Sequence, residues 1–278
     1  MARAKNRFNS IIFCLLLLLF AIFVGSPFYW ALVTSFKTAP QVSQMNSPFW
    51  PVPFTMSNYW EIISNTNFLK WYWNSIVVSA LSTVISVSVG ATAAYALIRL
   101  NFPGRRLLSS SVLMTYLIPP TILFIPFYLL FSKAHITDSI WSLVLSYPTF
   151  NIPFCTWILM GFFANIPKSI EEAARIDGAN SFQIFGLICV PLMKPGIVAA
   201  TVFSFNLSWM EFLYALSFIS TDYKKTVPVG LSELMVGDVV FWGPLMAGAA
   251  LTAFPVILLF IILQRHFVTG LTAGSVKG

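Results

Sequence analysis

The chain has 278 residues, of which 58% are apolar and only 9% are charged, and its mean hydropathy is +0.81. Soluble domains carry about 25% charged residues, so this composition excludes an ordinary soluble protein and predicts an integral membrane protein. The formal net charge is +7. In so apolar a chain, we interpret this charge as a signal of membrane topology and not of nucleic-acid binding.

Six apolar segments are long enough to cross a bilayer as helices. A spanning helix needs about 20 apolar residues, because its backbone N–H and C=O groups must be paired within the segment. The first segment follows a basic start, but its apolar run continues past Pro27 without a small-residue cleavage site, so we expect a retained anchor and not a signal peptide. In chain order, the expected spans are 11–33, 74–98, 107–131, 140–163, 196–220 and 245–263.

Lysine and arginine are distributed unequally between the two sides of these spans. Positive charge beside a span is retained in the cytoplasm. One side collects Arg3, Lys5, Arg7, Arg99, Arg105, Arg106, Lys168, Arg175, Lys194, Arg265 and Lys277, and the other collects Lys37, Lys70, Lys133, Lys224 and Lys225. We therefore expect an all-α membrane protein with both termini in the cytoplasm, made of an N-terminus (1–10), a six-span domain (11–264) and a C-terminal tail (265–278).

Residue types that serve enzymes and metal sites are sparse. The spacing of Cys14, Cys155 and Cys189 suits no metal site, and His135 and His266 are isolated. The sequence contains no G-x-x-x-x-G-K-[ST] motif for binding nucleotide phosphates. We therefore expect no catalytic residue, no metal and no cofactor in this chain.

An acidic cluster lies between the fourth and fifth expected spans, in the stretch EEAARIDGANSFQIFGLICVP at 171–191. Ser169 is positioned to cap a helix, with Glu172 three residues later completing a capping box. Both Glu171 and Glu172 would then lie in the first turn, where the helix dipole favours acids. A purely structural role for Glu172 as a capping acid is one interpretation of this pattern, and a binding role at an exposed helix is the other.

A second short helix is expected to follow. Gly178 comes two turns after the cap, as a glycine that ends a helix does. Asn180 or Ser181 can then begin another helix with Gln183 in its first turn. The residues expected to close this second helix are Pro191 and Pro195. The sequence therefore predicts two helices joined by a glycine corner, on the cytoplasmic side.

The same stretch fits a long motif with fixed spacing. Glu172-Ala173-Ala174, Gly178, Ile188 and Val190-Pro191 match E-A-A-x(3)-G-x(9)-I-x-L-P, with Val190 in place of the usual leucine. This is the signature of the membrane subunits of ABC importers. Further matches are AAYA with RLNFPGR at 93–105, Ile166-Pro167, and the tail from Gln264 to Gly278. Over nearly its whole length the chain resembles the second permease subunit of the carbohydrate-uptake group, the maltose, trehalose and multiple-sugar type.

This resemblance implies a prokaryotic inner-membrane assembly. The partners that it implies are a second permease, two ATPase subunits that hold ATP and Mg, an extracytoplasmic sugar-binding protein and a sugar substrate. Transport would proceed by alternating access, with the segment at about 167–191 docking on an ATPase. Carried over residue by residue, the docking core is Glu172, Ala173, Ala174 and Gly178, with Ile188, Val190 and Pro191 orienting the second helix and Glu171 and Asp177 flanking them.

One acid lies inside an expected span. Glu211 comes about fifteen residues after Gly196, and an ionisable group in a span usually faces a cavity or the bundle interior. Glu211, with Asn206 and Trp209, is a candidate for the translocation path, and a buried pair with a cation of the partner subunit is the alternative. Related permeases commonly have asparagine where this chain has Met210, which weakens the inference of sugar contact.

Two long segments are expected outside the membrane, at 34–73 and 221–244. In related permeases the second of them reaches toward the binding protein, so Phe241 and Trp242 are candidate contacts. Aromatic rings also anchor membrane interfaces generally, and that interpretation stays open.

Other functions are weighed against the sugar permease. A permease of an amino-acid or peptide type of ABC importer is the nearest alternative. A proton-coupled secondary transporter using Glu211 is a second, although the sequence has neither the several membrane acids nor the internal repeat typical of that class. A membrane scaffold without a transport role is a third.

Overall fold

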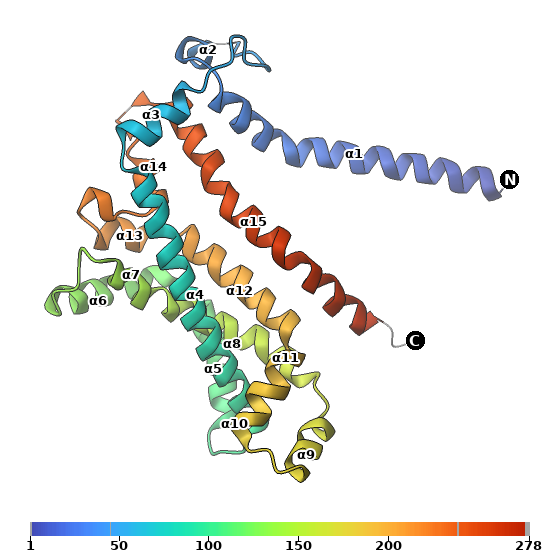
Figure 1. The fold of residues 1–278 in the computed structure, drawn as a ribbon. Helices are drawn as coiled ribbons and strands as arrows, with labels where there is room; N and C mark the ends of the chain where they lie inside the picture. The colour runs from blue at the N-terminus through green and yellow to red at the C-terminus, as the bar shows by residue number, and fades with distance from the viewer. Residues whose placement is uncertain (1, 45, 238, 276–278) are drawn as a thin grey trace. The chain divides into compact units, whose positions relative to one another are not determined.

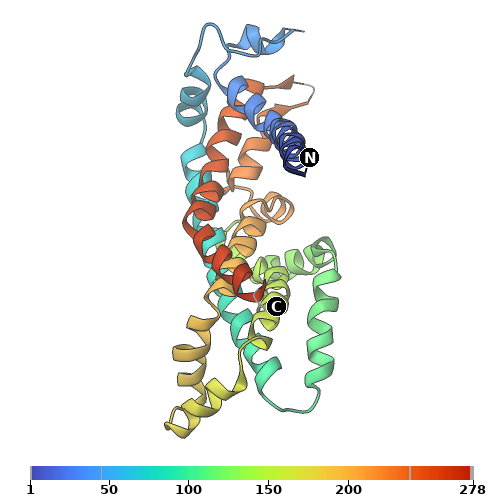
Figure 2. The ribbon, with the colours of Figure 1, turned by 90° about the vertical axis from the view of Figure 1, so that its right-hand side faces the viewer.

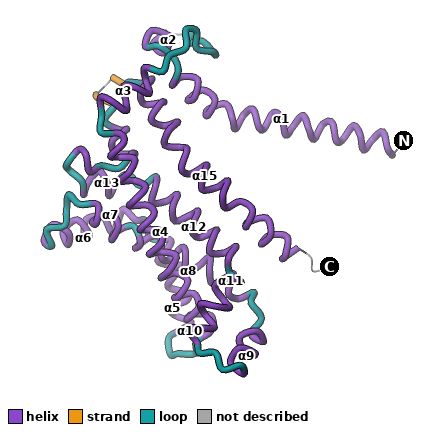
Figure 3. Tube along the Cα trace, viewed as in Figure 1, coloured by secondary structure: helices purple, strands orange, loops and turns teal. Residues whose placement is uncertain are grey.

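The fold is almost entirely helical in the computed structural model, which describes residues 2–44, 46–237 and 239–275. In the described residues, strands occur only in a short antiparallel hairpin of β1 (Met235–Val236) and β2 (Val239–Val240) (Figure 3). The chain divides into two compact units. The first comprises Met1–Phe68 with Leu231–Phe254, and the second comprises Leu69–Gly230 with Pro255–Gly278.

The first unit contains α1 (Ala2–Ser35), α2 (Ala39–Ser43), α3 (Ser57–Asn65), the β hairpin and the start of α15 (Trp242–Ser275). The buried side chain of Asn58 on α3 donates to the carbonyl oxygens of Ser35 at 2.9 Å and Lys37 at 2.8 Å, so it satisfies backbone groups at the end of α1. The expected loop at 34–73 is therefore folded over much of its length, with two helices of its own before α4 begins at Phe68.

The second unit is built on α4 (Phe68–Arg99), α8 (Pro148–Ala164) and α12 (Lys194–Trp209) (Figure 1). α8 packs against both of the other two helices. Small residues let these helices approach closely. A Cβ added to Gly90 of α4 would lie 2.7 Å from the Cβ of Cys155 on α8, which no real pair of such atoms tolerates. In a bilayer, where apolar helices gain little by leaving lipid, such close packing is a main source of helix association.

The apolar helices agree with most of the expected spans. Four candidate spans lie in the described residues, at Ile12–Ser35, Phe68–Arg99, Ile140–Ala164 and Trp242–Gln264, and two bent helix pairs raise the number to six if each pair is one span. α1 already begins at Ala2 and α15 continues to Ser275, so most of the expected termini 1–10 and 265–278 are helical. The last three residues of the tail, 276–278, lie outside the described residues.

The expected third span, 107–131, is wrong as a straight helix. The structure has α5 (Arg105–Leu117) and α6 (Pro120–Lys133), bent by 92° (Figure 2). Pro119 disfavours helical geometry at Ile118, which adopts an extended conformation with φ −73° and ψ 123°. Pro119 and Pro120 also lack the N–H groups that would continue the helix. The hydropathy of the run therefore concealed a corner that its proline pair creates.

The expected fifth span, 196–220, is also wrong in its second half. α12 ends at Trp209, and α13 (Leu213–Phe218) begins only after a break. α12 instead pairs with the preceding helical stretch Ser181–Leu192, at an angle of 78°. The expected fourth span, 140–163, is confirmed as the candidate span Ile140–Ala164. It consists of α7 (Ile140–Ser146) and α8, which meet at Tyr147.

Candidate functional site

The expected helix pair is present at one end of the second unit (Figures 1 and 2). We call residues 167–192 the hairpin. It consists of α9 (Lys168–Ile176), a turn, and one helical stretch formed by α10 (Ser181–Gln183), a π-helical segment (Ile184–Cys189) and α11 (Val190–Leu192).

The corner of the hairpin is as predicted. Gly178 has φ +87°, a left-handed conformation that glycine adopts without steric cost. The N–H of Gly178 donates to the carbonyl of Arg175 at 3.1 Å, and that of Ala179 donates to the carbonyl of Ala174 at 2.9 Å. This pair of bonds is the Schellman motif, which satisfies the last carbonyls of α9.

The start of the second helix is also confirmed. The Asn180 side-chain oxygen accepts from the Gln183 N–H at 3.0 Å, and the Gln183 side-chain oxygen accepts from the Asn180 N–H at 2.9 Å. These reciprocal bonds form a capping box, which orders both backbone donors. The direction in which the second helix leaves the turn is thus determined locally.

The predicted cap of the first helix is wrong. α9 begins at Lys168 after Pro167, so Ser169 is its second residue and cannot be its N-cap. Proline presets a backbone angle compatible with the helix, and its side chain offers no acceptor. Glu172 therefore does not complete a capping box with Ser169.

Pro191 was expected to close the second helix, but it lies within that helix. A proline in an α-helix loses one hydrogen bond, and its ring collides with the carbonyl four residues earlier. The turn before it is widened into a π-helix, in which the Val190 N–H donates to the Phe185 carbonyl five residues back. Pro195 similarly lies in the first turn of α12.

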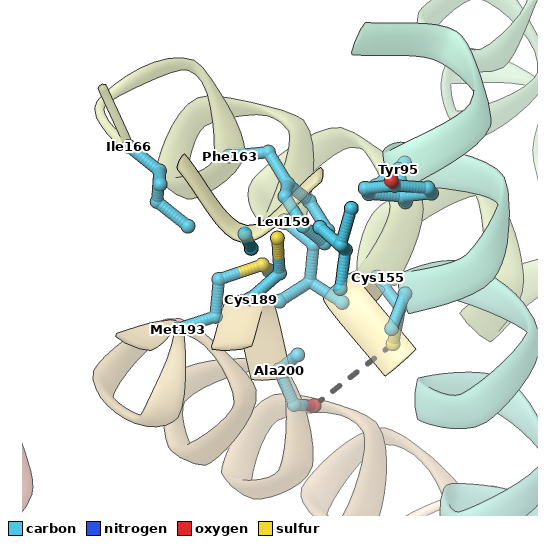
Figure 4. Close-up of a cluster of buried hydrophobic side chains, with 12 residues drawn as sticks. Tyr95, Cys155, Leu159, Phe163, Ile166, Cys189, Met193 and Ala200 are labelled. Carbon is cyan, nitrogen blue, oxygen red and sulfur yellow. Dashed lines mark hydrogen bonds between the residues drawn. The ribbon is translucent and has the colours of Figure 1, made fainter. Parts of the chain in front are cut away.

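The inner face of the hairpin is anchored in an apolar core (Figure 4). We call this cluster the hairpin core, and it consists of Ala91, Ala94, Tyr95, Cys155, Leu159, Phe163, Ile166, Ala174, Ile184, Cys189, Met193 and Ala200. The partly buried Ile188 packs against it. Ala174, expected on the docking surface, is instead buried, and Ile184 is a fully buried anchor that the motif did not indicate.

The outer face of the hairpin carries exposed apolar side chains. Ile176 is 87% exposed, Phe182 is 88% exposed and Leu187 is 74% exposed. Glu172, Ala173, Asp177, Gly178 and Pro191 are exposed as well, and Val190 is half-buried. The motif did not single out these apolar residues. Ile184 and Ile188 face the hairpin core, whereas Phe182 and Leu187 are exposed. Apolar side chains gathered on an exposed face are typical of a surface that binds a partner.

The two adjacent acids of the hairpin point in different directions. Glu172 is exposed, whereas Glu171 is buried and pairs with Arg99 at the end of α4. Glu171 Oε1 lies 2.5 Å from the Arg99 Nε, and both side chains are about one-twentieth exposed. The same guanidinium donates to the carbonyl oxygens of Ile166 at 2.6 Å and Phe163 at 3.2 Å.

Glu211 was expected inside a span helix. It lies instead in the break between α12 and α13. Its carboxylate accepts from the hydroxyl of Tyr147 at 2.8 Å and from the backbone N–H groups of Tyr214 at 2.9 Å and Ala215 at 3.2 Å. Tyr214 in turn donates through its hydroxyl to the carbonyl oxygen of Pro120 at 2.6 Å. One connected set of hydrogen bonds thus joins the breaks of the third and fifth spans to Tyr147 of the fourth span.

These contacts bear on the alternatives for Glu211. No cation of the described residues forms a salt bridge with it, and its hydrogen bonds are those of a helix cap. Asn206 is half-buried, while Trp209 is buried and packs against Tyr72 and Phe205. A path role for these residues stays a prediction. In the first unit, Phe241 and Trp242 are about half exposed, and their role as contacts also stays a prediction.

Asp138 forms a cluster of polar contacts that the sequence did not indicate. We call its contacts with Thr221 and Lys224 the Asp138 knot. Asp138 lies between α6 and α7 and accepts from the backbone N–H of Thr221 at 2.8 Å and from the Lys224 Nζ at 2.8 Å. Partial burial would raise the pKa of Asp138, but the hydrogen bonds from Lys224 and Thr221 outweigh it and hold the pKa well below its ordinary value. The knot fastens the turn at 220–225 to the start of α7.

We expect the Asp138 knot to make stability depend on pH. The pKa of Asp138 is lower in the folded chain than in the unfolded chain. The stability that its carboxylate contributes is therefore fully present above the ordinary pKa of 3.8, and it is lost as the pH falls below that value. Asp138→Asn should therefore melt at a lower temperature than the parent at pH 7, and the difference should begin to shrink only as the pH falls below 3.8. Thermal melts of the purified protein in detergent measure this. The exposed Glu61→Gln is the control, and a constant difference at all pH values would contradict the role of Asp138.

Comparison with known proteins places the chain in a family. A family model described as "Binding-protein-dependent transport system inner membrane component" matches residues 86–272, which include the hairpin and all of its core. The chain belongs to this family. It is 35% identical to the inner membrane ABC transporter permease protein YcjP of Escherichia coli (strain K12), over 100% of both chains. It is 32% identical to the trehalose/maltose transport system permease protein MalG of Thermococcus litoralis, over 94% of each chain.

The fold is also that of ABC importers. The structure is similar to a chain of a bacterial ABC transporter involved in the import of the acidic polysaccharide alginate, with a TM-score of 0.81. The two chains are 24% identical, and the match covers 95% of this chain and 98% of the other. The family is one of inner membrane components, which agrees with the composition and with the apolar helices described above.

Proposed function

We propose that this chain is a permease subunit of a binding-protein-dependent ABC importer that carries a sugar, an oligo- or disaccharide, across the inner membrane. The observation that carries the proposal is the hairpin, which is anchored by an apolar core on its inner face and bears exposed acidic and apolar side chains on its outer face. A rigid element of this kind can transmit the movement of a bound partner to the rest of the chain. A loop without such an anchor would bend and would not transmit the movement.

The occupant of the outer face is an ATPase subunit. Its cleft must accept the small Ala173, the acid Glu172 and the bulky apolar Ile176 and Phe182, so we expect it to be apolar with a cation at its rim. ATP and Mg²⁺ are held by this partner, because the chain itself has no nucleotide-binding motif. Closure of two ATPase subunits would move the hairpin and switch the spans between inward-facing and outward-facing states.

The other partners follow from the family and the relatives. A second permease completes the path, with residues 11–264 as the contribution of this chain and both termini in the cytoplasm. An extracytoplasmic binding protein delivers the sugar, and Phe241 and Trp242 are the proposed contacts with it. The sugar class is inferred from the trehalose/maltose relative and from the alginate importer. Glu211 needs no role in proton coupling, because its contacts are those of a cap.

The test is the ATPase rate of the complete importer in proteoliposomes, with its binding protein present. Trehalose and maltose are compared with methionine as candidate substrates. Stimulation by a sugar together with the binding protein supports the proposal. Stimulation by methionine and not by sugars would favour the amino-acid type of importer instead. Uptake that needs a proton gradient and no ATP would overturn the proposal altogether.

A further inference from the structure

Arg99 connects three elements at the hairpin end of the second unit. Arg99 is the last residue of α4, and its side chain binds Glu171 on α9. It also donates to the carbonyl oxygens of Phe163 and Ile166, near the end of α8. A cation at the carbonyl end of a helix is favoured by the helix dipole. The guanidinium therefore satisfies an acid and two backbone acceptors at once, in a setting from which solvent is nearly excluded.

The adjacent position of Glu171 and Glu172 separates their contacts. Neighbouring residues on a helix point about 100° apart, so one of them turns into the protein while the other faces out. Glu171 is 3% exposed, and Glu172 is exposed. The outward acid is free to meet a partner, and the inward acid is already engaged by the chain itself.

We infer that the Arg99–Glu171 pair is the mechanical link between the hairpin and the spans, and that both are positioning residues for transport coupling. This inference rests on the proposed docking of the hairpin on an ATPase. A buried ion pair resists separation, because pulling it apart would leave two unpaired charges out of water. A displacement of α9 is therefore transmitted to α4 and α8 together, and the three elements move as one body.

Arg105 and Arg106, the first two residues of α5, provide a contrast with Arg99. Arg105 donates to the carbonyl oxygens of Leu97 at 2.6 Å and Ile98 at 3.1 Å, so it satisfies carbonyls at the end of α4 and not groups of the hairpin. Arg106 is exposed. Of the arginines near the end of α4, the one that bridges to the hairpin is Arg99. Arg106→Gln is therefore a matched control for loss of a positive charge.

The first experiment measures ATPase retention, basal hydrolysis, sugar-stimulated hydrolysis and uptake in the reconstituted importer. In Arg99→Gln and Glu171→Gln we expect the ATPase to co-purify and basal hydrolysis to continue, because the outer face is unchanged. Sugar stimulation and uptake should fall about tenfold, within the range of about 5- to 150-fold typical of coupling between sites. The exchange of both charges, Arg99→Glu with Glu171→Arg, should restore part of the loss, and Arg106→Gln should behave like the parent.

Other outcomes separate this inference from the proposed function. If the parent importer responds to sugar and both single variants respond equally well, the link is overturned while the function stands. If the parent itself shows no sugar-stimulated hydrolysis, the proposed function fails first. Loss of the ATPase from both single variants would also overturn the link, since the pair would then serve docking.

A second measurement compares the importer with the ion pair intact and with the pair removed. Spin labels at the exposed positions Thr92 of α4 and Ser169 of α9, in a Cys14→Ser background, report the distance between the two helices. One rigid body predicts the same distance in the nucleotide-free and ATP-bound importer, and a broadened distance in Arg99→Gln. A distance that changes with nucleotide in the parent importer would overturn the inference.

Discussion

Replacing Glu172 with lysine is expected to separate the ATPase from the permease and to abolish uptake. Glu172 is exposed on the outer face of the hairpin, beside the small Ala173 that lets a partner approach. Reversal of its charge would place a cation against the cation proposed at the rim of the ATPase cleft. Losses at desolvated charge pairs are about 2–5 kcal/mol, which lowers the affinity by about 30-fold or more.

Retention of the ATPase by the purified importer measures this effect directly. Glu61→Lys on α3 makes the same change of charge at an exposed position outside the hairpin, and it should leave retention unchanged. Phe182→Ser tests the apolar part of the same surface and should weaken retention without altering charge. A Glu172→Lys importer that holds its ATPase and transports normally would exclude docking at this residue.

The wrong prediction at Ser169 sharpens the role of Glu172. Had the two residues formed a capping box, a loss of activity in Glu172 variants could have come from unfolding of α9. Because α9 begins at Lys168 after Pro167, its start does not depend on Glu172. The circular dichroism of the variant should therefore equal that of the parent, and a docking defect can be separated from a folding defect.

Local features of the hairpin were predictable from the sequence. The corner at Gly178 and the start of the second helix at Asn180 each depend on residues within a few positions of one another. The corner was expected, and so was a helix that starts at Asn180 or Ser181 with Gln183 in its first turn. The direction in which Glu171 points was not predictable, because its partner Arg99 lies 72 positions away. The prediction that Ala174 lies on the docking surface was wrong for the same reason. Its burial depends on the other residues of the hairpin core and not on the motif around it.

The interrupted spans show a second limit of sequence reasoning. Hydropathy averages over a window and does not register a corner, so the runs at 107–131 and 196–220 were each expected to be one helix. The proline pair at 119–120 was a visible signal of the first corner. The break after Trp209 had no comparable signal, because Met210, Glu211 and Phe212 are all compatible with a helix. It depends on the carboxylate of Glu211, which turns back to accept from the backbone of α13.

Replacing Glu211 with alanine is expected to destabilise the second unit and to reduce transport of every substrate equally. The change removes the acceptor for two backbone N–H groups and leaves the hydroxyl of Tyr147, a fully buried side chain, without its partner. Hydrogen bonds to charged groups contribute about 1.5–3 kcal/mol each, and an unsatisfied buried group costs about 1–3 kcal/mol. A loss of about 3 kcal/mol in the free energy of unfolding is therefore reasonable, since neighbouring contributions do not add fully.

Graded variants distinguish this cap from a residue of the translocation path. Glu211→Gln keeps one oxygen acceptor and should lose less stability than Glu211→Ala. Tyr147→Phe removes only the phenol hydroxyl and leaves both backbone bonds, so its melting temperature should lie closest to that of the parent. A path residue would behave in the opposite way, with an unchanged melting temperature and an altered preference among sugars. Because the contacts of the carboxylate connect three spans, a variant that melts early should lose uptake of all its sugars in the same proportion.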